Sequence, residues 1–182
     1  MTSLRDALGG ISRLGLDTTP FLYFVEGRPD FGAVCTDVFT AVDAGQVEVY
    51  TSVLTLSETL TKPLAVGDGA LESAFRNLLT RTRGVYMMSV SPAIEGIVAR
   101  LCDRYDVLRT ADAVQIATAV ASGCEAFLTG DARLKGVTEI PVLILGDFTP
   151  RGVVTLSPGP CVAPLIPTQA EDTSPVCTNA VL

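Results

Sequence analysis

Residues 110–131 read TADAVQIATAVASGCEAFLTGD, and this stretch decides the fold. Its first part, residues 111–122, is rich in Ala, Val and Ile and stops at Gly123, a residue type that commonly closes helices. Residues 126–129 then form a short apolar run, which is typical of a strand buried on both faces. Asp131 follows that run directly after one glycine. The stretch therefore predicts a helix, a buried parallel strand and an acid at the carboxyl end of the strand.

The same alternation of helices and apolar strands extends over most of the chain. Further strands are expected at residues 11–16, 47–50, 85–88 and 142–145. Helices are expected from Thr18 to Gly27, over 31–44, from a cap at Thr51 or Ser52 to Lys62-Pro63, over 69–80, from Ser91 to Tyr105, and from a cap at Thr110 to Ser122. Strands that are apolar throughout favour a sheet covered on both faces. We therefore predict an α/β fold, a three-layer α/β/α sandwich around a parallel sheet of about five strands.

The composition changes near Pro150, which divides the chain into two parts. Residues 1–150 have the length and apolar content of one domain with a single core. Residues 151–182 contain many Pro, Ser and Thr residues and show neither a helical nor a strand period. We expect this second part to be a flexible C-terminal extension that is dispensable for folding.

The charged residues restrict the chemistry. The chain has 182 residues, of which 20 are Asp or Glu, 13 are Lys or Arg and none is His. The absence of histidine excludes histidine general bases and Ser-His or Cys-His nucleophile pairs. A net charge of −7 excludes a general basic footprint for nucleic acid, so a polyanion must meet local arginines or bound cations. The best phosphate-binding candidates are Arg104 and Arg109, because they precede Asp112 at an expected helix start.

The cysteines and the apolar runs indicate in which cellular compartment the protein is expected. The five cysteines form no C-x-x-C pair, which favours reduced thiols over a zinc site or disulfides. The N-terminus lacks the pattern of a secretory signal, and the apolar runs are too short to span a bilayer. We expect a cytoplasmic protein with no membrane segment.

Four acids occupy positions that a parallel sheet would bring together. Asp17 and Asp131 follow expected strands, Asp112 lies in a first helical turn, and Glu58 lies about two turns into a helix. Ligand sites in open parallel sheets lie at the carboxyl ends of the strands. Clustered carboxylates repel one another, so this arrangement favours one or two divalent cations. Each acid taken singly also has a structural alternative, since Asp and Glu often cap helices or oppose their dipoles.

The chain resembles the PIN-domain nucleases, a family that includes the VapC toxins. The resemblance is carried by four motifs, LDTTP at 16–20, TSVLTLSE at 51–58, LRTADAVQIATA at 108–119 and FLTGD at 127–131. It extends from about Leu14 to Leu145 in the order and spacing of the family. The chain departs from the family at Gly130, where many relatives have Asn, and at Leu134, where some have a further acid.

The resemblance implies a site and a reaction. The catalytic and metal-binding residues would be Asp17, Glu58, Asp112 and Asp131, with Mg²⁺ or Mn²⁺ as the cofactor. Water activated there would cleave RNA phosphodiester bonds and leave a 5′-phosphate and a 3′-hydroxyl. The hydroxyls of Thr18 and Thr129 could orient a carboxylate or a bound water. Helix capping for Thr18 and plain strand propensity for Thr129 remain open as alternatives.

The function that the resemblance implies is a metal-dependent endoribonuclease, the toxin of a type II toxin-antitoxin pair. Its partners would be RNA, a cognate antitoxin and a second copy of the chain. One alternative is a PIN-fold interaction domain without catalysis. Another is a haloacid-dehalogenase-like phosphotransferase, but the D-x-D-x-T pattern of that chemistry is absent after Asp17. A Rossmann dinucleotide site is disfavoured because no G-x-G-x-x-G follows the first strand.

Overall fold

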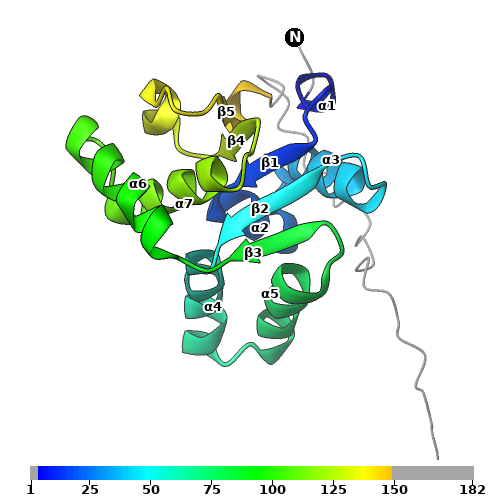
Figure 1. The fold of residues 1–182 in the computed structure, drawn as a ribbon. Coiled ribbons are helices and arrows are strands. Elements are labelled where there is room, and N and C mark those ends of the chain that lie inside the picture. Colours follow the sequence, from blue (N-terminus) through cyan, green and yellow to red (C-terminus); the bar gives the residue numbers. More distant parts are fainter. Residues whose placement is uncertain (1–3, 149–182) are drawn as a thin grey trace, which may run out of the picture.

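A five-stranded sheet forms the centre of the molecule (Figure 1). The computed structural model describes residues 4–148, so the expected extension at 151–182 lies outside the described residues. The strands are β1 (Arg13–Leu16), β2 (Glu48–Ser52), β3 (Val85–Met88), β4 (Ala126–Thr129) and β5 (Val142–Ile144). Their order is β3-β2-β1-β4-β5, and every neighbouring pair is parallel. The predicted α/β fold with a parallel sheet is confirmed.

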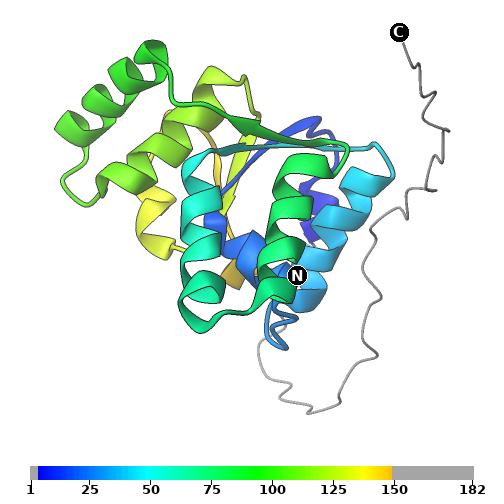
Figure 2. The same cartoon turned by 90° about the horizontal axis from the view of Figure 1, so that it is seen from below.

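Helices cover the sheet in two layers. They are α1 (Leu4–Ala7), α2 (Thr18–Val25), α3 (Gly32–Asp43), α4 (Leu54–Val66), α5 (Gly69–Arg81), α6 (Pro92–Arg104) and α7 (Thr110–Ala121), with short 3₁₀ helices η1 (Ala132–Gly136) and η2 (Leu145–Asp147). Helix α7 packs on β1, β2 and β4, and α6 packs on α7. Seen from below, α3, α4 and α5 lie together, away from the α6–α7 pair (Figure 2). The order of layers is that of an α/β/α sandwich.

The core lies in two clusters, one on each face of the sheet. One contains Leu14 and Leu16 of β1 with Phe21 and Phe39 from α2 and α3. The other packs α6 and α7 against Phe127 of β4. All four residues of β4 are buried, as the apolar run predicted. Burial of β1 and β4 between two helix layers fixes the strand ends that carry the predicted acids.

Helix α4 differs from the expectation at both ends. Neither Thr51 nor Ser52 is its N-cap, because β2 extends through Ser52 and Val53 takes the capping position without a side-chain cap. Pro63 does not end the helix. Proline removes one backbone hydrogen-bond donor, yet α4 continues through the buried Pro63 to Val66. The helix closes at Gly67, whose φ of +71° suits glycine.

Two smaller expectations also need correction. The N-cap of α7 is Arg109, and Thr110 is the first residue inside the helix. Coverage of the sheet is complete over β4 but not over β3, where Tyr86 is 41% exposed and stacks on Tyr50 of β2. Within residues 4–148, no helix combines the length and the apolar character that a bilayer crossing requires.

Candidate active site

Two of the predicted acids meet at the carboxyl ends of β1 and β4. Because these strands are neighbours, the backbone N–H of Asp17 donates to the carbonyl of Leu128 at 3.1 Å. Thr129 is fully buried and connects both acids. Its hydroxyl donates to Asp17 Oδ2 at 2.7 Å and accepts from the backbone N–H of Asp131 at 3.0 Å. Thr129 therefore orients the Asp17 carboxylate, which is one of the two interpretations that the sequence left open for this residue.

Asp17 accepts two hydrogen bonds and lies within electrostatic reach of two other predicted acids. It caps α2, and its Oδ1 accepts a hydrogen bond from the Thr18 backbone N–H at 2.8 Å. Burial raises the pKa of Asp17 above its ordinary value, while the hydrogen bonds from Thr129 and Thr18 lower it. The negative charges of Asp112 and Glu58 raise this pKa further. Three of the predicted carboxylates therefore interact electrostatically, and a cation among them would relieve the repulsion.

Glu58 and Asp112 reach the site from helices on opposite faces of the sheet. The Glu58 carboxylate, on α4, accepts a hydrogen bond from the Thr18 hydroxyl. Asp112 lies in the first turn of α7, and its Oδ2 accepts from the backbone N–H of Arg109 at 3.3 Å. Asp112 thus caps the start of α7, which is the structural alternative to catalysis that the sequence left open for each acid. The hydrogen bond occupies one oxygen only.

Asp131 is held by a residue that the sequence analysis did not single out, Arg133. The Nε of Arg133 donates to both carboxylate oxygens of Asp131, at 3.0 and 2.8 Å, and its Nη2 also contacts Oδ2. These hydrogen bonds hold the pKa of Asp131 below its ordinary value. The same Nη2 lies 4.0 Å from Asp112 Oδ2. The guanidinium of Arg133 thus stands between two of the four acids.

The site has the donor chemistry of a divalent-cation centre but not a closed set of ligands. All four side chains offer oxygen, which Mg²⁺ and Mn²⁺ prefer. Within the described part of the chain, no three acidic, cysteine or histidine side chains gather closely enough to hold a metal ion. The guanidinium of Arg133 is bound to Asp131 and lies between this acid and Asp112. The residues therefore fit the ion by the chemistry of their donor atoms, which are all carboxylate oxygens.

The comparison with protein families agrees with this arrangement. A family model described as the PIN domain matches residues 15–140, which span all four acids. The chain belongs to the PIN domain family. No curated protein matches the chain.

Solved structures share the PIN fold at low sequence identity. The chain is similar to VapBC2 from Rickettsia felis, bound to a DNA fragment from its promoter, with 11% identity, a TM-score of 0.59 and coverage of 72% of this chain and 98% of that one. It is also similar to VapC20 from Mycobacterium tuberculosis, a sarcin-ricin loop cleaving toxin, with 19% identity, a TM-score of 0.55 and coverage of 71% of this chain and 99% of that one. A third similar structure is a toxin-antitoxin complex from Klebsiella pneumoniae, with 21% identity, a TM-score of 0.54 and coverage of 74% of this chain and 98% of that one.

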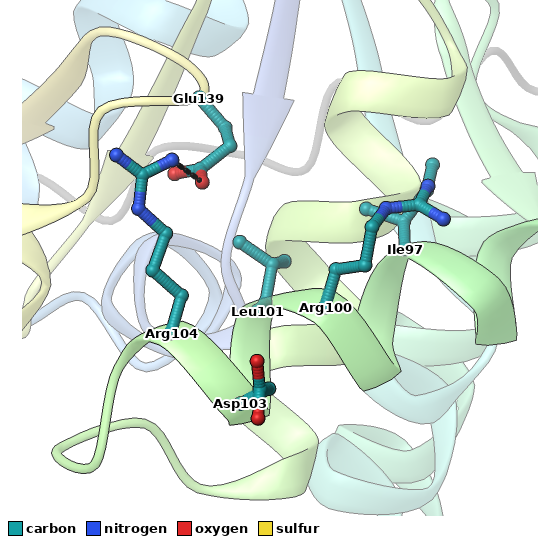
Figure 3. Close-up of a pocket in the computed structure, with 6 residues that line it drawn as sticks. All are labelled: Ile97, Arg100, Leu101, Asp103, Arg104 and Glu139. Carbon is teal, nitrogen blue, oxygen red and sulfur yellow. Dashed lines mark hydrogen bonds and ion pairs between the residues drawn. The ribbon is translucent and has the colours of Figure 1, made fainter.

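The two arginines predicted for substrate binding occupy different surroundings. Arg109 is exposed at the start of α7, close enough to Asp131 for its charge to lower the pKa of that carboxyl. Arg104 is paired with Glu139 at 3.0 Å. That pair lines a surface pocket of about 510 Å³ beside α6 (Figure 3). The other residues that line this pocket are Ile97, Arg100, Leu101 and Asp103. Arg109 thus lies near the acids, whereas Arg104 is engaged by Glu139 at the pocket.

Gly130, the departure from the family pattern, has a steric explanation. A Cβ at this position would lie 2.7 Å from Cγ2 of Thr19, which is closer than real side chains approach. Thr19 therefore occupies the space that an Asn side chain would need, and the loop between Thr129 and Asp131 stays close to α2. The PIN site keeps its fourth acid despite this departure.

Replacing Arg133 with Gln should tighten the binding of Mn²⁺. The variant removes a positive charge that competes for Asp131 and Asp112. The pair is half exposed, so the gain should be modest, up to about fivefold at low salt, and should shrink as salt increases. Titration followed by the electron paramagnetic resonance signal of free Mn²⁺ measures it. Lys135→Gln is the control, because Lys135 pairs with Asp147 instead. Weaker Mn²⁺ binding by Arg133→Gln would show that Arg133 supports the site rather than competing for it.

Proposed function

We propose that the chain is a metal-dependent endoribonuclease that acts as the toxin of a type II toxin-antitoxin pair. The observation that carries the proposal is the meeting of Asp17 and Asp131 at the carboxyl ends of β1 and β4, where the Thr129 hydroxyl contacts both residues. Burial and the charges of Asp112 and Glu58 also raise the pKa of Asp17. Such perturbed groups at strand ends are typical of functional sites. Membership of the PIN family supports the nuclease, and the similarity to toxin-antitoxin structures supports the biological role.

Each side chain has a role in this proposal. Asp17, Glu58, Asp112 and Asp131 would hold Mg²⁺ or Mn²⁺. The ion would lower the pKa of a bound water and neutralise the scissile phosphate. Thr129 orients Asp17 through its 2.7 Å hydrogen bond. Thr18 contributes its backbone N–H to Asp17 and its hydroxyl to Glu58.

One observation favours the second candidate, an interaction domain without catalysis. Arg133 already neutralises Asp131 and lies 4.0 Å from Asp112, so the charge of the site is partly balanced without any metal. If that ion pair were permanent, the four acids would be a structural cluster. The two candidates differ in whether Mn²⁺ is bound and whether RNA is cleaved.

Cleavage of a mixed RNA pool separates the candidates. The full chain is incubated with Mn²⁺, with Mg²⁺ and with chelator, and the product ends are identified. The nuclease should give fragments with 5′-phosphate and 3′-hydroxyl ends that appear only with metal. Asp17→Asn, purified in parallel, excludes a contaminating nuclease, because it should be inactive. A folded wild-type chain that neither binds Mn²⁺ nor cleaves RNA would favour the interaction domain.

Replacing Arg109 with Ala should weaken RNA binding without weakening metal binding. The protein carries a net charge of −7, so contact with RNA must rest on few cationic groups. Each lost phosphate contact on a single strand lowers the salt slope of affinity by about 0.7. Labelled RNA is titrated at two salt concentrations in Ca²⁺, used as a non-catalytic substitute. Arg104→Ala, whose side chain pairs with Glu139, is the comparison. Equal affinities and slopes for Arg109→Ala and wild type would remove Arg109 from the site.

The proposed partners follow from the same role. Solved structures similar to this chain include toxin-antitoxin complexes, which supports a cognate antitoxin as a partner. We also propose a homodimer and a cytoplasmic location. Among the residues described, Cys35, Cys102 and Cys124 are free thiols. Light scattering of the purified full chain measures its mass and tests the dimer.

A further inference from the structure

A buried network of polar side chains includes Thr18, the residue that bonds to Asp17 and Glu58. It joins Gln115 of α7, only 3% exposed, to the hydroxyls of Thr18, Thr51 and Thr55. The carboxamide of Gln115 donates from Nε2 to Thr55 Oγ1 at 2.8 Å and to Thr18 Oγ1 at 3.3 Å. Its Oε1 accepts from the backbone N–H of Ser52 at 3.1 Å. Gln115 is the one long polar side chain in the apolar run of α7, and this is the signal the sequence offered.

The direction of the hydrogen bonds in this network is fixed at both ends. The backbone N–H of Ser52 can only donate, so it selects Oε1 of Gln115 and turns Nε2 toward the threonines. At the other end, the Thr18 hydroxyl donates its single proton to the carboxyl group of Glu58. The oxygen of Thr18 is then left to accept from Gln115. Only this orientation of the Gln115 amide accepts from the Ser52 backbone N–H and also donates to the Thr18 oxygen.

The network therefore reaches the acids through Thr18. The Thr18 backbone N–H holds Asp17, and its hydroxyl holds Glu58. A hydroxyl that rotated to donate elsewhere would leave Glu58 without this bond. Donation from Gln115 Nε2, together with the Thr55 hydroxyl at 3.3 Å, keeps Thr18 as an acceptor on its inner side.

We propose that Gln115 is a positioning residue of the nuclease site. It orients the Thr18 hydroxyl toward Glu58 and so holds the Glu58 carboxylate beside Asp17, ready to share a cation. The inference rests on the proposed function, because it assigns Gln115 a role in metal binding. The alternative is that Gln115 only satisfies polar groups between α7 and β2. That role would affect stability but not the affinity for metal of the folded protein.

Gln115→Met distinguishes the two roles, since it keeps the length of the side chain and removes both donors. Dissociation constants for Mn²⁺ are measured by electron paramagnetic resonance, and melting temperatures are measured without metal. Loss of a group that orients metal ligands typically lowers affinity roughly 10–100-fold, and we expect a loss in this range. The matched control is Thr118→Val, which removes a buried hydroxyl that donates to the Val114 carbonyl of the same helix at 2.7 Å. It should lower the melting temperature and leave Mn²⁺ affinity unchanged.

A double-mutant cycle tests whether Gln115 acts through Thr18. Thr18→Val should weaken Mn²⁺ binding, Thr18→Ser should not, and adding Gln115→Met to Thr18→Val should cause no further loss. Wild-type affinity in Gln115→Met would overturn the inference, as would additive losses in the double variant. Should Gln115→Met fail to fold, wild-type affinity in Thr18→Val would overturn it equally. Wild-type chain that shows no Mn²⁺ binding sensitive to Asp17→Asn would instead overturn the proposed function itself.

Discussion

Asp17→Asn should cleave RNA at least about 10²-fold more slowly than the wild-type chain, yet melt at a higher temperature without metal. The loss of activity is expected because Asp17 is the acid whose surroundings include both Glu58 and Asp112. The gain in stability is expected because the same surroundings disfavour its negative charge.

The pH dependence of that gain follows from the raised pKa of Asp17. Above the ordinary pKa of an Asp, the unfolded chain has released this proton while the folded chain tends to keep it. The folded state then binds more protons, so the contribution of Asp17 to stability falls as pH rises through the window between the two values. The melting temperatures of Asp17→Asn and wild type should therefore converge at acidic pH and separate toward neutrality.

A matched carboxylate controls this experiment. Asp43 is exposed at the end of α3. Helix α3 leads into the start of β2, whereas the acids Asp17 and Asp131 follow the carboxyl ends of their strands. Asp43→Asn should retain full cleavage and a melting temperature close to wild type at all pH values. A metal-free Asp17→Asn that melts below wild type at neutral pH would contradict the electrostatic description of the site.

Gly15→Ala should be the most destabilising of the small substitutions in the sheet. A Cβ at Gly15 would lie 2.4 Å from the Cβ of Ala119 and 2.9 Å from the ring of Phe127. Gly15 is in the middle of β1, so α7 could retreat only by breaking its packing on three strands. Overpacking of this kind costs roughly 1–3 kcal/mol. We expect the upper part of that range, measured by chemical unfolding.

The control is Gly136→Ala at the end of η1, where an added Cβ has no neighbour within 4 Å. It should unfold within about 0.5 kcal/mol of wild type. Because α7 carries Asp112 and Gln115, Gly15→Ala should also weaken Mn²⁺ binding by displacing that helix. A Gly15→Ala variant as stable as wild type would show that α7 does not pack as closely on β1 as the structure has it.

The sequence predicted the parts of the site that depend on strand ends. Asp17 and Asp131 could be placed from the apolar runs before them, because parallel strands end at one edge of a sheet. The position of Glu58 rested on resemblance to a family, since a helix position alone does not say which way it faces. Pro63 misled because proline commonly ends a helix, whereas here it is buried inside α4, and sequence patterns do not show burial directly.

The interactions that the sequence analysis missed are those between side chains far apart in the chain or on tight turns. Arg133 lies two residues after Asp131, and only the geometry of η1 turns its guanidinium back onto that acid and toward Asp112. Gln115 reaches Thr18 across 97 positions of sequence. Tyr86 reads as a buried strand residue, but β3 is an edge strand with one face left open.

The most direct test of a shared cation site is anomalous diffraction from crystals soaked with Mn²⁺. The predicted result is a manganese peak at about 2.0–2.3 Å from an oxygen of Asp17 and from at least one of Glu58, Asp112 and Asp131. Arg133 should have released Asp131 in that crystal. No peak at this edge of the sheet at millimolar Mn²⁺, or a peak that does not touch Asp17 while Arg133 still binds Asp131, would contradict the metal-dependent nuclease.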